Sequence, residues 1–186
     1  MKLPIIVGVA GTNGSGKDTL GDLLAEHAGY KQVSLSNILR QILDEREKPH
    51  TRENLSGVSR EIREQDGDEG LAIRTLEANQ DQKLCLTSIR TPGEARAIQQ
   101  HGGVVVWIDA DQKIRYERVQ AANRGRNEDN ITFEEFQDHE HAEMYPSEQG
   151  GGLNMAGVRD VADITIINEF ESKEAYIEYL RSEFEL

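Results

Sequence analysis

The sequence of 186 residues predicts an α/β fold in which helices cover both faces of a five-stranded parallel sheet. Short apolar runs recur along the chain, and segments of helical periodicity separate them. Strands buried on both faces read as continuous apolar runs, because neither side of the sheet meets water. A glycine-rich loop also joins the first apolar run to a helical segment, as in β-loop-α units. The expected strands are 5–9, 32–35, 84–87, 104–108 and 164–167.

The loop after the first strand spans residues 11–19 and reads GTNGSGKDT. Its glycines let successive N–H groups point inward, Lys17 adds a mobile cation, and the following helix offers its positive N-terminus. Apolar residues at 20, 23, 24 and 28 predict that helix. A turn that binds nothing rarely needs three glycines and a lysine, so we expect the loop to hold ATP. The residues predicted to bind it are Asn13, Gly14, Ser15, Gly16, Lys17, Asp18 and Thr19.

Position 18 departs from the usual phosphate-binding motif. That motif places a serine or threonine directly after the lysine, where its hydroxyl binds Mg²⁺. Here Asp18 takes that place and the hydroxyl comes one residue later, at Thr19. Two interpretations of Asp18 remain open: it holds Mg²⁺ directly or through water, or its charge stabilises the helix N-terminus. Asp18 and Thr19 are the predicted metal ligands.

The chain is acidic, with a formal net charge of −13 and no stripe of lysine or arginine. Nucleic-acid phosphates would be repelled, so we expect no nucleic-acid partner. The single cysteine, Cys85, rules out an internal disulfide and is expected to be a small buried residue. No apolar run is long enough for a signal peptide or a membrane span, and we expect no membrane partner and a cytoplasmic location.

Two segments interrupt the alternation of strands and helices. Residues 36–80 carry three helical patterns and no strand, with Thr51 as a cap of the second and a break at 67–70 before the third. Residues 125–152 are polar, hold a helix opened by Thr132, and end in three glycines. We predict a helical insertion at 36–80 and a mobile cover at 125–152. The core of this single domain then comprises 1–35, 81–124 and 153–186.

Several arginines fall where a phosphate-transfer site would need positive charge. Arg90 follows the third strand, at the carboxyl edge of the sheet where open α/β folds bind ligands. Arg40 closes the first inserted helix, and Arg118 lies on the helix after the fourth strand. Arg124 and Arg126 sit at the hinge of the predicted cover. Each alone is by default a surface ion-pair residue, but their joint placement favours an anion site.

On these residues the chain resembles a known family. The loop 14–19, the segment ending Leu39-Arg40, and the arginines at 90, 118, 124 and 126 are similar to those of nucleoside monophosphate kinases of the adenylate kinase type and of dephospho-CoA kinases. Residues 162–168 resemble the last strand of dephospho-CoA kinase-like and guanylate kinase-like proteins. The resemblance spans nearly the whole chain. It implies a P-loop NTPase fold with sheet order 2-3-1-4-5, acceptor binding in the insertion, and a closing lid.

The resemblance also implies roles for individual residues. Lys17 would hold the β- and γ-phosphates, Arg118 the adenine or the donor phosphates, and Arg124 or Arg126 the transferring group. Asn168 would join the nucleotide-binding set. The predicted substrate-binding residues are Ser36, Arg40, Arg60, Arg63 and Arg90. The predicted catalytic residues are Lys17, Arg90, Arg118, Arg124 and Arg126.

The chain departs from the family pattern in the third strand and the acceptor segment. Adenylate kinases end the third strand with Asp-Gly, where the acid organises Mg²⁺, whereas this chain has Thr87-Ser88. Leu35-Ser36-Asn37 replaces the usual Thr-Gly-Asp before Leu-Arg, so AMP is not supported as the acceptor. Arg60 and Arg63 share a helix face, and ion pairs with Glu61 or Glu64 compete with a role in acceptor binding.

Other polar residues are weaker candidates. Asp109 and Asp111 are candidates to steer Mg²⁺, although Asp111 is better placed as a helix cap. His139 and His141 are two apart, so on a helix they point to different sides and favour a solvated surface over a metal site. Trp107 lies in an apolar strand and is expected in the core.

The sequence therefore predicts an ATP- and Mg²⁺-dependent kinase whose small acceptor is a nucleoside or deoxynucleoside monophosphate. Dephospho-CoA is a second acceptor class, although the expected position offers no carboxylate base for a hydroxyl acceptor. A third alternative is a nucleotide-responsive binding protein that hydrolyses ATP slowly, which the missing strand-end aspartate favours.

Overall fold

The computed structural model describes residues 1–122, 131–146 and 152–186. Five parallel strands form one sheet in the order β2-β3-β1-β4-β5. This confirms both the fold class and the strand order implied by the resemblance. The strands lie within two residues of their predicted bounds: β1 (Ile6–Gly11), β2 (Lys31–Ser34), β3 (Leu84–Thr87), β4 (Val104–Asp109) and β5 (Ile164–Ile167).

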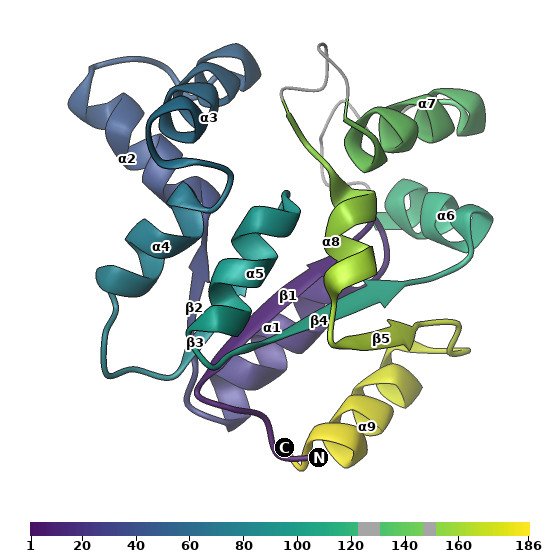
Figure 1. Ribbon diagram of the computed structural model, residues 1–186. Coiled ribbons are helices and arrows are strands. Elements are labelled where there is room, and N and C mark those ends of the chain that lie inside the picture. Colours follow the sequence, from purple (N-terminus) through teal and green to yellow (C-terminus); the bar gives the residue numbers. More distant parts are fainter. Residues whose placement is uncertain (123–130, 147–151) are drawn as a thin grey trace.

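Helices cover both faces of the sheet, as Figure 1 shows. On one face, α1 (Lys17–His27) and α9 (Lys173–Phe184) bury an apolar cluster that includes Leu24 and Leu180 against the strands. On the other face, α5 (Pro92–Gln100) and α8 (Met155–Val161) pack over the central strands around the fully buried Trp107. The strands alternate their side chains between these two clusters, because the side-chain period of a strand is two. Cys85 is buried, as predicted.

The segment predicted as a helical insertion forms three helices that stand beside the β2 edge of the sheet (Figure 1). They are α2 (Ser36–Glu45), α3 (Arg52–Asp66) and α4 (Gly70–Glu77). Thr51 caps α3 by accepting a hydrogen bond from the Asn54 N–H, as its position predicted. Apolar side chains of these helices join the core cluster on the α5 face, so the segment is packed onto the domain.

Two further helices are α6 (Gln112–Ala122) and α7 (Phe133–Met144). They lie on the side of the molecule away from α2, α3 and α4 (Figure 1). Thr132 and Glu135 open α7 with reciprocal hydrogen bonds, which confirms the predicted helix start. Of the predicted cover, the structure describes residues 131–146 and 152, and Arg124 and Arg126 lie outside the described residues. Among the described helices, none is long and apolar enough to cross a membrane.

Candidate functional site

The phosphate-binding loop joins β1 to α1 and needs glycine at two points. Gly14 and Gly16 have φ angles of 78° and 90°, which L side chains rarely adopt. A Cβ on Gly16 would lie 2.4 Å from Asn168 Nδ2, and one on Gly14 would lie 2.5 Å from the Arg115 carbonyl oxygen. The loop is therefore curled tightly against the end of β5 and the first turn of α6.

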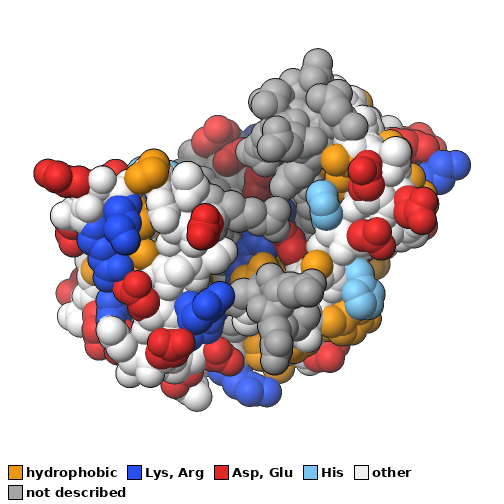
Figure 2. Space-filling view, turned by 90° about the horizontal axis from the view of Figure 1, so that it is seen from above, with side chains coloured by type: hydrophobic (Ala, Val, Ile, Leu, Met, Phe, Trp, Pro, Cys, Tyr) orange, Lys and Arg blue, Asp and Glu red, His pale blue; other side chains and the backbone are white. Residues whose placement is uncertain are grey.

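A cavity of about 690 Å³ lies over this loop at the carboxyl edge of the sheet. The surface seen in Figure 2 is hollowed at its centre, where blue atoms of lysine or arginine are visible. The cavity brings together most of the predicted site residues from four separate parts of the chain. The predicted residues that line it are Asn13, Gly14, Gly16, Lys17, Asp18, Thr19, Arg90, Arg118 and Asn168.

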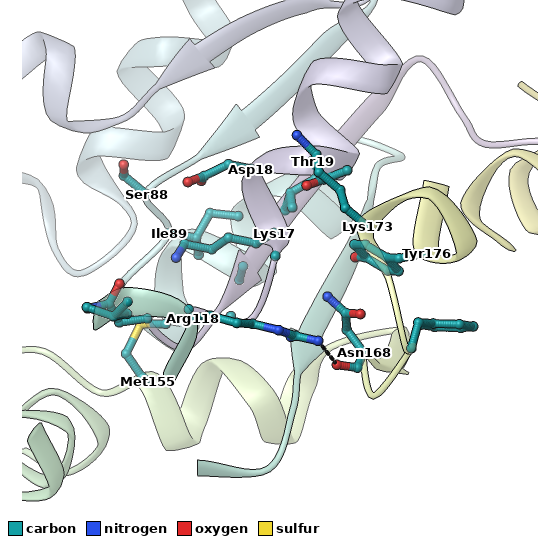
Figure 3. A pocket seen from close by; sticks show the side chains of 18 of the residues that line it. Lys17, Asp18, Thr19, Ser88, Ile89, Arg118, Met155, Asn168, Lys173 and Tyr176 are labelled. Atoms are coloured by element: carbon teal, nitrogen blue, oxygen red, sulfur yellow. Dashed lines mark hydrogen bonds between the residues drawn. The ribbon is translucent and has the colours of Figure 1, made fainter. Parts of the chain in front are cut away.

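Asn168 links β5 to the loop and is held in place from three sides. Its N–H donates to the Asp109 carbonyl at 2.7 Å, and its side-chain amide donates to the Ser15 carbonyl at 2.8 Å. Arg118 Nη2 donates to the Asn168 carbonyl at 3.0 Å, the dashed line in Figure 3. Ser15 is fully buried beneath the loop, so its side chain does not line the cavity. These bonds order the wall of the cavity around Arg118.

Four buried polar atoms of the described residues have no hydrogen-bond partner: Ser15 Oγ, whose residue does not line the cavity, and Arg118 Nη1, Asn168 Oδ1 and Tyr176 Oη, whose residues do. An unsatisfied buried polar atom costs free energy, and a ligand or water in the cavity would satisfy those at its wall. Burial raises the pKa of Tyr176, so its hydroxyl remains a hydrogen-bond donor at neutral pH. The set fits a polar ligand such as ATP.

Asp18 and Thr19 begin α1 and face the same cavity. Carboxylate and hydroxyl oxygens are suitable ligands for Mg²⁺, so these residues fit the predicted metal role. The described residues contain no group of three or more His, Cys, Asp or Glu side chains able to hold a metal ion. His139 and His141, which both lie on α7, therefore belong to no such group among the described residues. Phosphate oxygens would have to complete the coordination of Mg²⁺ here.

Asp109 has a structural role, and a part in steering Mg²⁺ stays a prediction. Its Oδ1 accepts a hydrogen bond from Thr12 Oγ1 at 2.8 Å and pairs with Arg115 Nε at 3.3 Å, and it does not line the cavity. Asp111 caps α6, as predicted, by accepting from the Lys113 and Ile114 N–H groups. The acid at the end of β4 therefore fastens the loop.

Arg115 was not assigned a role from the sequence and proves to be buried, with a relative exposure of 4%. It forms ion pairs with Asp109 on β4 and Glu140 on α7, and its side chain also reaches the Asn13 carbonyl. Burying the charge is tolerable because both acids and two carbonyls satisfy the guanidinium. Arg115 thereby connects α7 to the phosphate-binding loop.

A second acid of α7, Glu143, reaches the cavity and was also missed from the sequence. Arg90 Nη1 donates to Glu143 Oε2 at 2.9 Å, and both residues line the cavity. Their side chains are 41% and 34% exposed, so a ligand can reach either one. The spacing of Glu140 and Glu143, three residues apart on one helix, was the available signal. The pair places a carboxylate beside the strand-end arginine.

The other predicted acceptor residues do not line this cavity. Arg40 is exposed on α2 and donates to Ser36 Oγ at 2.8 Å and to Asn37 Oδ1 at 3.0 Å. Arg60 is exposed on α3, and Arg63 on the same helix is partly buried. Glu61, one of the partners expected for these two arginines, instead pairs with Arg46 at 2.7 Å. A direct role of Ser36, Arg40, Arg60 and Arg63 in acceptor binding stays a prediction.

The turn that carries Arg90 is fixed by Glu94, whose relative exposure is 2%. Glu94 Oε2 accepts from the Arg90 N–H at 2.6 Å and from the Thr91 N–H at 3.2 Å, which completes a capping box at the start of α5. Burial raises the pKa of Glu94 to about 7, although these hydrogen bonds and the charges of Arg63 and Arg90 act in the opposite direction.

Replacing Glu94 by glutamine should remove a pH dependence of stability. Because the pKa of Glu94 rises from 4.5 to about 7 on folding, the folded state binds the proton more tightly. The free energy of unfolding should therefore fall as pH rises through this window, by up to about 1.4 kcal/mol per pH unit, and then level off. Urea unfolding at pH 5 and pH 8 should show this fall in the wild type and a smaller one in Glu94→Gln.

The matched control is Glu174→Gln, which changes an exposed carboxylate on α9 and should keep the wild-type difference between the two pH values. Equal differences in the wild type and in Glu94→Gln would contradict the role given to Glu94.

Comparison with known proteins assigns the chain to a family. The family described as "AAA domain" matches residues 7–143. The UPF0200 protein of Hyperthermus butylicus is 30% identical over 174 residues, which cover 91% of this chain and 88% of that protein. The chain belongs to the UPF0200 family of AAA-domain proteins. The UPF0200 protein of Pyrococcus horikoshii is 27% identical over 183 residues, with 91% and 93% of the two chains covered.

Solved structures share the fold at lower identity. Shikimate kinase from Bacteroides thetaiotaomicron aligns with a TM-score of 0.58 at 17% identity, over 97% of this chain and 98% of that one. TT1252 from Thermus thermophilus aligns with a TM-score of 0.56 at 19% identity, over 98% of both chains. The family member described here therefore has the P-loop kinase fold.

Proposed function

We propose that the protein is an ATP- and Mg²⁺-dependent phosphotransferase that acts on a nucleoside or deoxynucleoside monophosphate. One observation carries this proposal: a single cavity is lined both by the phosphate-binding loop with Lys17 and by Arg90 at the end of β3. Phosphoryl transfer needs cations around two anionic partners, whereas a nucleotide-binding switch needs them around one. The net charge of −13 supports a small acceptor in the cytoplasm over a nucleic acid.

The residues that line the cavity have separate roles in the proposed reaction. The loop N–H groups and Lys17 bind the β- and γ-phosphates, and Arg118 and Asn168 bind the rest of the nucleotide. Arg90 orients the acceptor phosphate, of which one oxygen attacks the γ-phosphorus as the bond to the β-phosphate oxygen breaks and ADP leaves. Asp18 and Thr19 would hold Mg²⁺, which would neutralise part of the charge of the phosphates. Arg124 or Arg126 would stabilise the transferring group, a role that stays a prediction.

A second acceptor class, a hydroxyl such as that of dephospho-CoA, is favoured by Glu143. A hydroxyl nucleophile needs a base to take its proton, whereas a phosphate acceptor is already anionic at neutral pH. Glu143 places a carboxylate in the cavity next to Arg90. In this alternative Arg90 binds an anionic group of the acceptor, and Glu143 accepts the hydroxyl proton as the oxygen attacks the γ-phosphorus.

Coupled turnover assays with Mg²⁺·ATP across a panel of nucleoside and deoxynucleoside monophosphates, with dephospho-CoA included, test the proposal. A diphosphate product from one of the monophosphates supports the first acceptor class, and phosphorylated dephospho-CoA supports the second. ATP hydrolysis that no acceptor stimulates would contradict both and favour a nucleotide-responsive switch.

Replacing Glu143 by glutamine should separate the two acceptor classes. With a monophosphate acceptor, the change removes the carboxylate that competes for Arg90, so the acceptor KM should fall by about twofold to fivefold, the range of a partly exposed ion pair. With a hydroxyl acceptor, the change removes the base, so kcat should fall by about 100-fold or more. Steady-state kinetics with the acceptor varied measure both constants.

Glu134→Gln is the control, because Glu134 lies exposed in the first turn of α7 and does not line the cavity. An unchanged KM and kcat in Glu143→Gln would show that the ion pair with Arg90 has no part in acceptor binding.

A further inference from the structure

A chain of hydroxyl groups connects α2 with the cavity. Ser34 Oγ at the end of β2 lies 2.8 Å from Ser36 Oγ and 2.8 Å from Ser88 Oγ, and Arg40 Nη1 donates to Ser36 Oγ at 2.8 Å. Of these residues Ser88 lines the cavity, and it directly follows Thr87, the last residue of β3. Arg40 and Ser36, which do not reach the cavity themselves, are thus linked to it through two hydroxyls.

The number of hydroxyl protons determines how many hydrogen bonds the three linked serines can donate to a ligand. Three serine hydroxyls carry three protons, and the two contacts between them use two, so one hydroxyl proton remains. A guanidinium can only donate, so Ser36 already accepts a charged hydrogen bond and becomes a better donor itself. Hydrogen bonds in such a chain strengthen one another when they run in one direction. The direction from Arg40 to Ser88 leaves the free proton on Ser88, at the cavity.

The turn after β3 holds Ser88 in an unusual conformation. Its φ angle is 62°, in the left-handed region that a serine rarely adopts. Such a conformation persists where the surrounding structure fixes the residue. In Figure 3, the Ser88 side chain lies on the same side of Lys17 as the carboxylate of Asp18, at the end of the cavity near Ile89. Ser88 and Arg90 follow β3 two residues apart, and both line the cavity together with Lys17.

We propose that Ser88 donates a hydrogen bond to an oxygen of the terminal phosphate of bound ATP. Ser34, Ser36 and Arg40 are positioning residues that direct the Ser88 proton into the cavity. This inference rests on the proposed function, because it requires the cavity to bind a triphosphate. The chain has Thr87-Ser88 where adenylate kinases have Asp-Gly, and this contact would give the turn after β3 a hydrogen-bond donor to the phosphate without the strand-end acid.

Calorimetric binding of ATP and ADP to the full chain, with and without Mg²⁺, tests the assignment. Ser88→Ala should weaken ATP binding by about tenfold, as expected for a hydrogen bond to a charged group, and leave ADP binding within about twofold. Ser88→Gly should have the same effect on ATP while relieving the strained φ angle, so thermal unfolding of this variant separates the hydroxyl from the backbone. Ser56→Ala, which removes an exposed hydroxyl on α3, should change neither affinity.

The positioning residues need a readout that a structural defect would not produce. Ser34→Ala should weaken ATP binding about threefold without changing ADP binding, because the proton on Ser88 loses its direction. Ser34→Thr keeps the hydroxyl and should restore the wild-type ratio of ATP to ADP affinity. If the ratio of ATP to ADP affinity in Ser34→Ala stays at the wild-type value, the linked serine hydroxyls do not direct the Ser88 proton.

Three results would overturn the proposal in distinguishable ways. Loss of ATP affinity in Ser88→Ala only when Mg²⁺ is present would place Ser88 at the metal and not at the phosphate. If Ser88→Ala weakens ATP and ADP binding equally, or weakens neither, Ser88 does not contact the terminal phosphate. The proposed function would remain intact. Absence of ATP binding in the wild type would overturn both the inference and the proposed function.

Discussion

Replacing Lys17 by alanine should lower the turnover number by about 100-fold to 1000-fold or more, the range seen when one preorganised donor to a developing charge is removed. Lys17 lies at the start of α1 and lines the cavity, and its ammonium donates to the Thr12 carbonyl at 3.2 Å. Its position within the loop allows it to follow the γ-phosphate as negative charge shifts during transfer. The chain offers no second ammonium within the loop itself.

Steady-state kinetics and calorimetry with Mg²⁺·ATP measure this effect on catalysis and on nucleotide affinity. Lys113→Ala is the matched control, because Lys113 is exposed near the start of α6 and outside the cavity. Wild-type turnover and wild-type ATP affinity in Lys17→Ala would show that the loop does not hold a triphosphate.

Replacing Arg90 by alanine should abolish acceptor-dependent turnover while leaving ATP binding within about twofold. Arg90 is the guanidinium proposed to bind the acceptor phosphate, and losing a charged hydrogen-bond donor to a phosphate typically costs about 1.5–3 kcal/mol, with a further loss where it orients the attacking oxygen. Acceptor kcat/KM should therefore fall by about 100-fold or more. The loop and Arg118, which are proposed to bind the donor, are unchanged by the substitution.

The variant also leaves Glu143 without its partner, so the double variant Arg90→Ala/Glu143→Gln is needed to separate the two effects. If the lost turnover reflects a missing guanidinium, the double variant stays inactive. Arg96→Ala, an exposed arginine on α5, should behave as the wild type. A protein that only hydrolyses ATP as a switch would retain its activity in Arg90→Ala.

The strands and the loop were predictable because their signals are local. A β-branched run such as Ile6-Val7 reads as a buried strand whatever surrounds it, and the loop carries its own glycines and lysine. The order of the strands is not local, and it came from resemblance to known kinases. The sheet then placed Arg90 and Asn168 at one cavity, because residues at the carboxyl ends of parallel strands meet at one edge, and α6 added Arg118.

The charge pairs of the site carry no local signal. Arg115 and Glu140 are 25 residues apart, and Arg90 and Glu143 are 53 apart, so nothing in the sequence matches one to the other. The sequence also did not show where the Arg40 side chain lies. The periodicity of α2 shows which face of the helix is apolar but not how the helix is oriented relative to the cavity. Glu94 could have been found, because Thr91 and Glu94 have the spacing of a capping box.

The close contact of Gly16 with Asn168 ties the two ends of the chain together. Position 16 favours glycine for one reason that is local, the φ angle of 90°, and one that is distant, the side chain of Asn168. Shortening Asn168 would relieve the second reason only. A side chain introduced at position 16 should therefore remain unfavourable even in a chain whose residue 168 has been shortened.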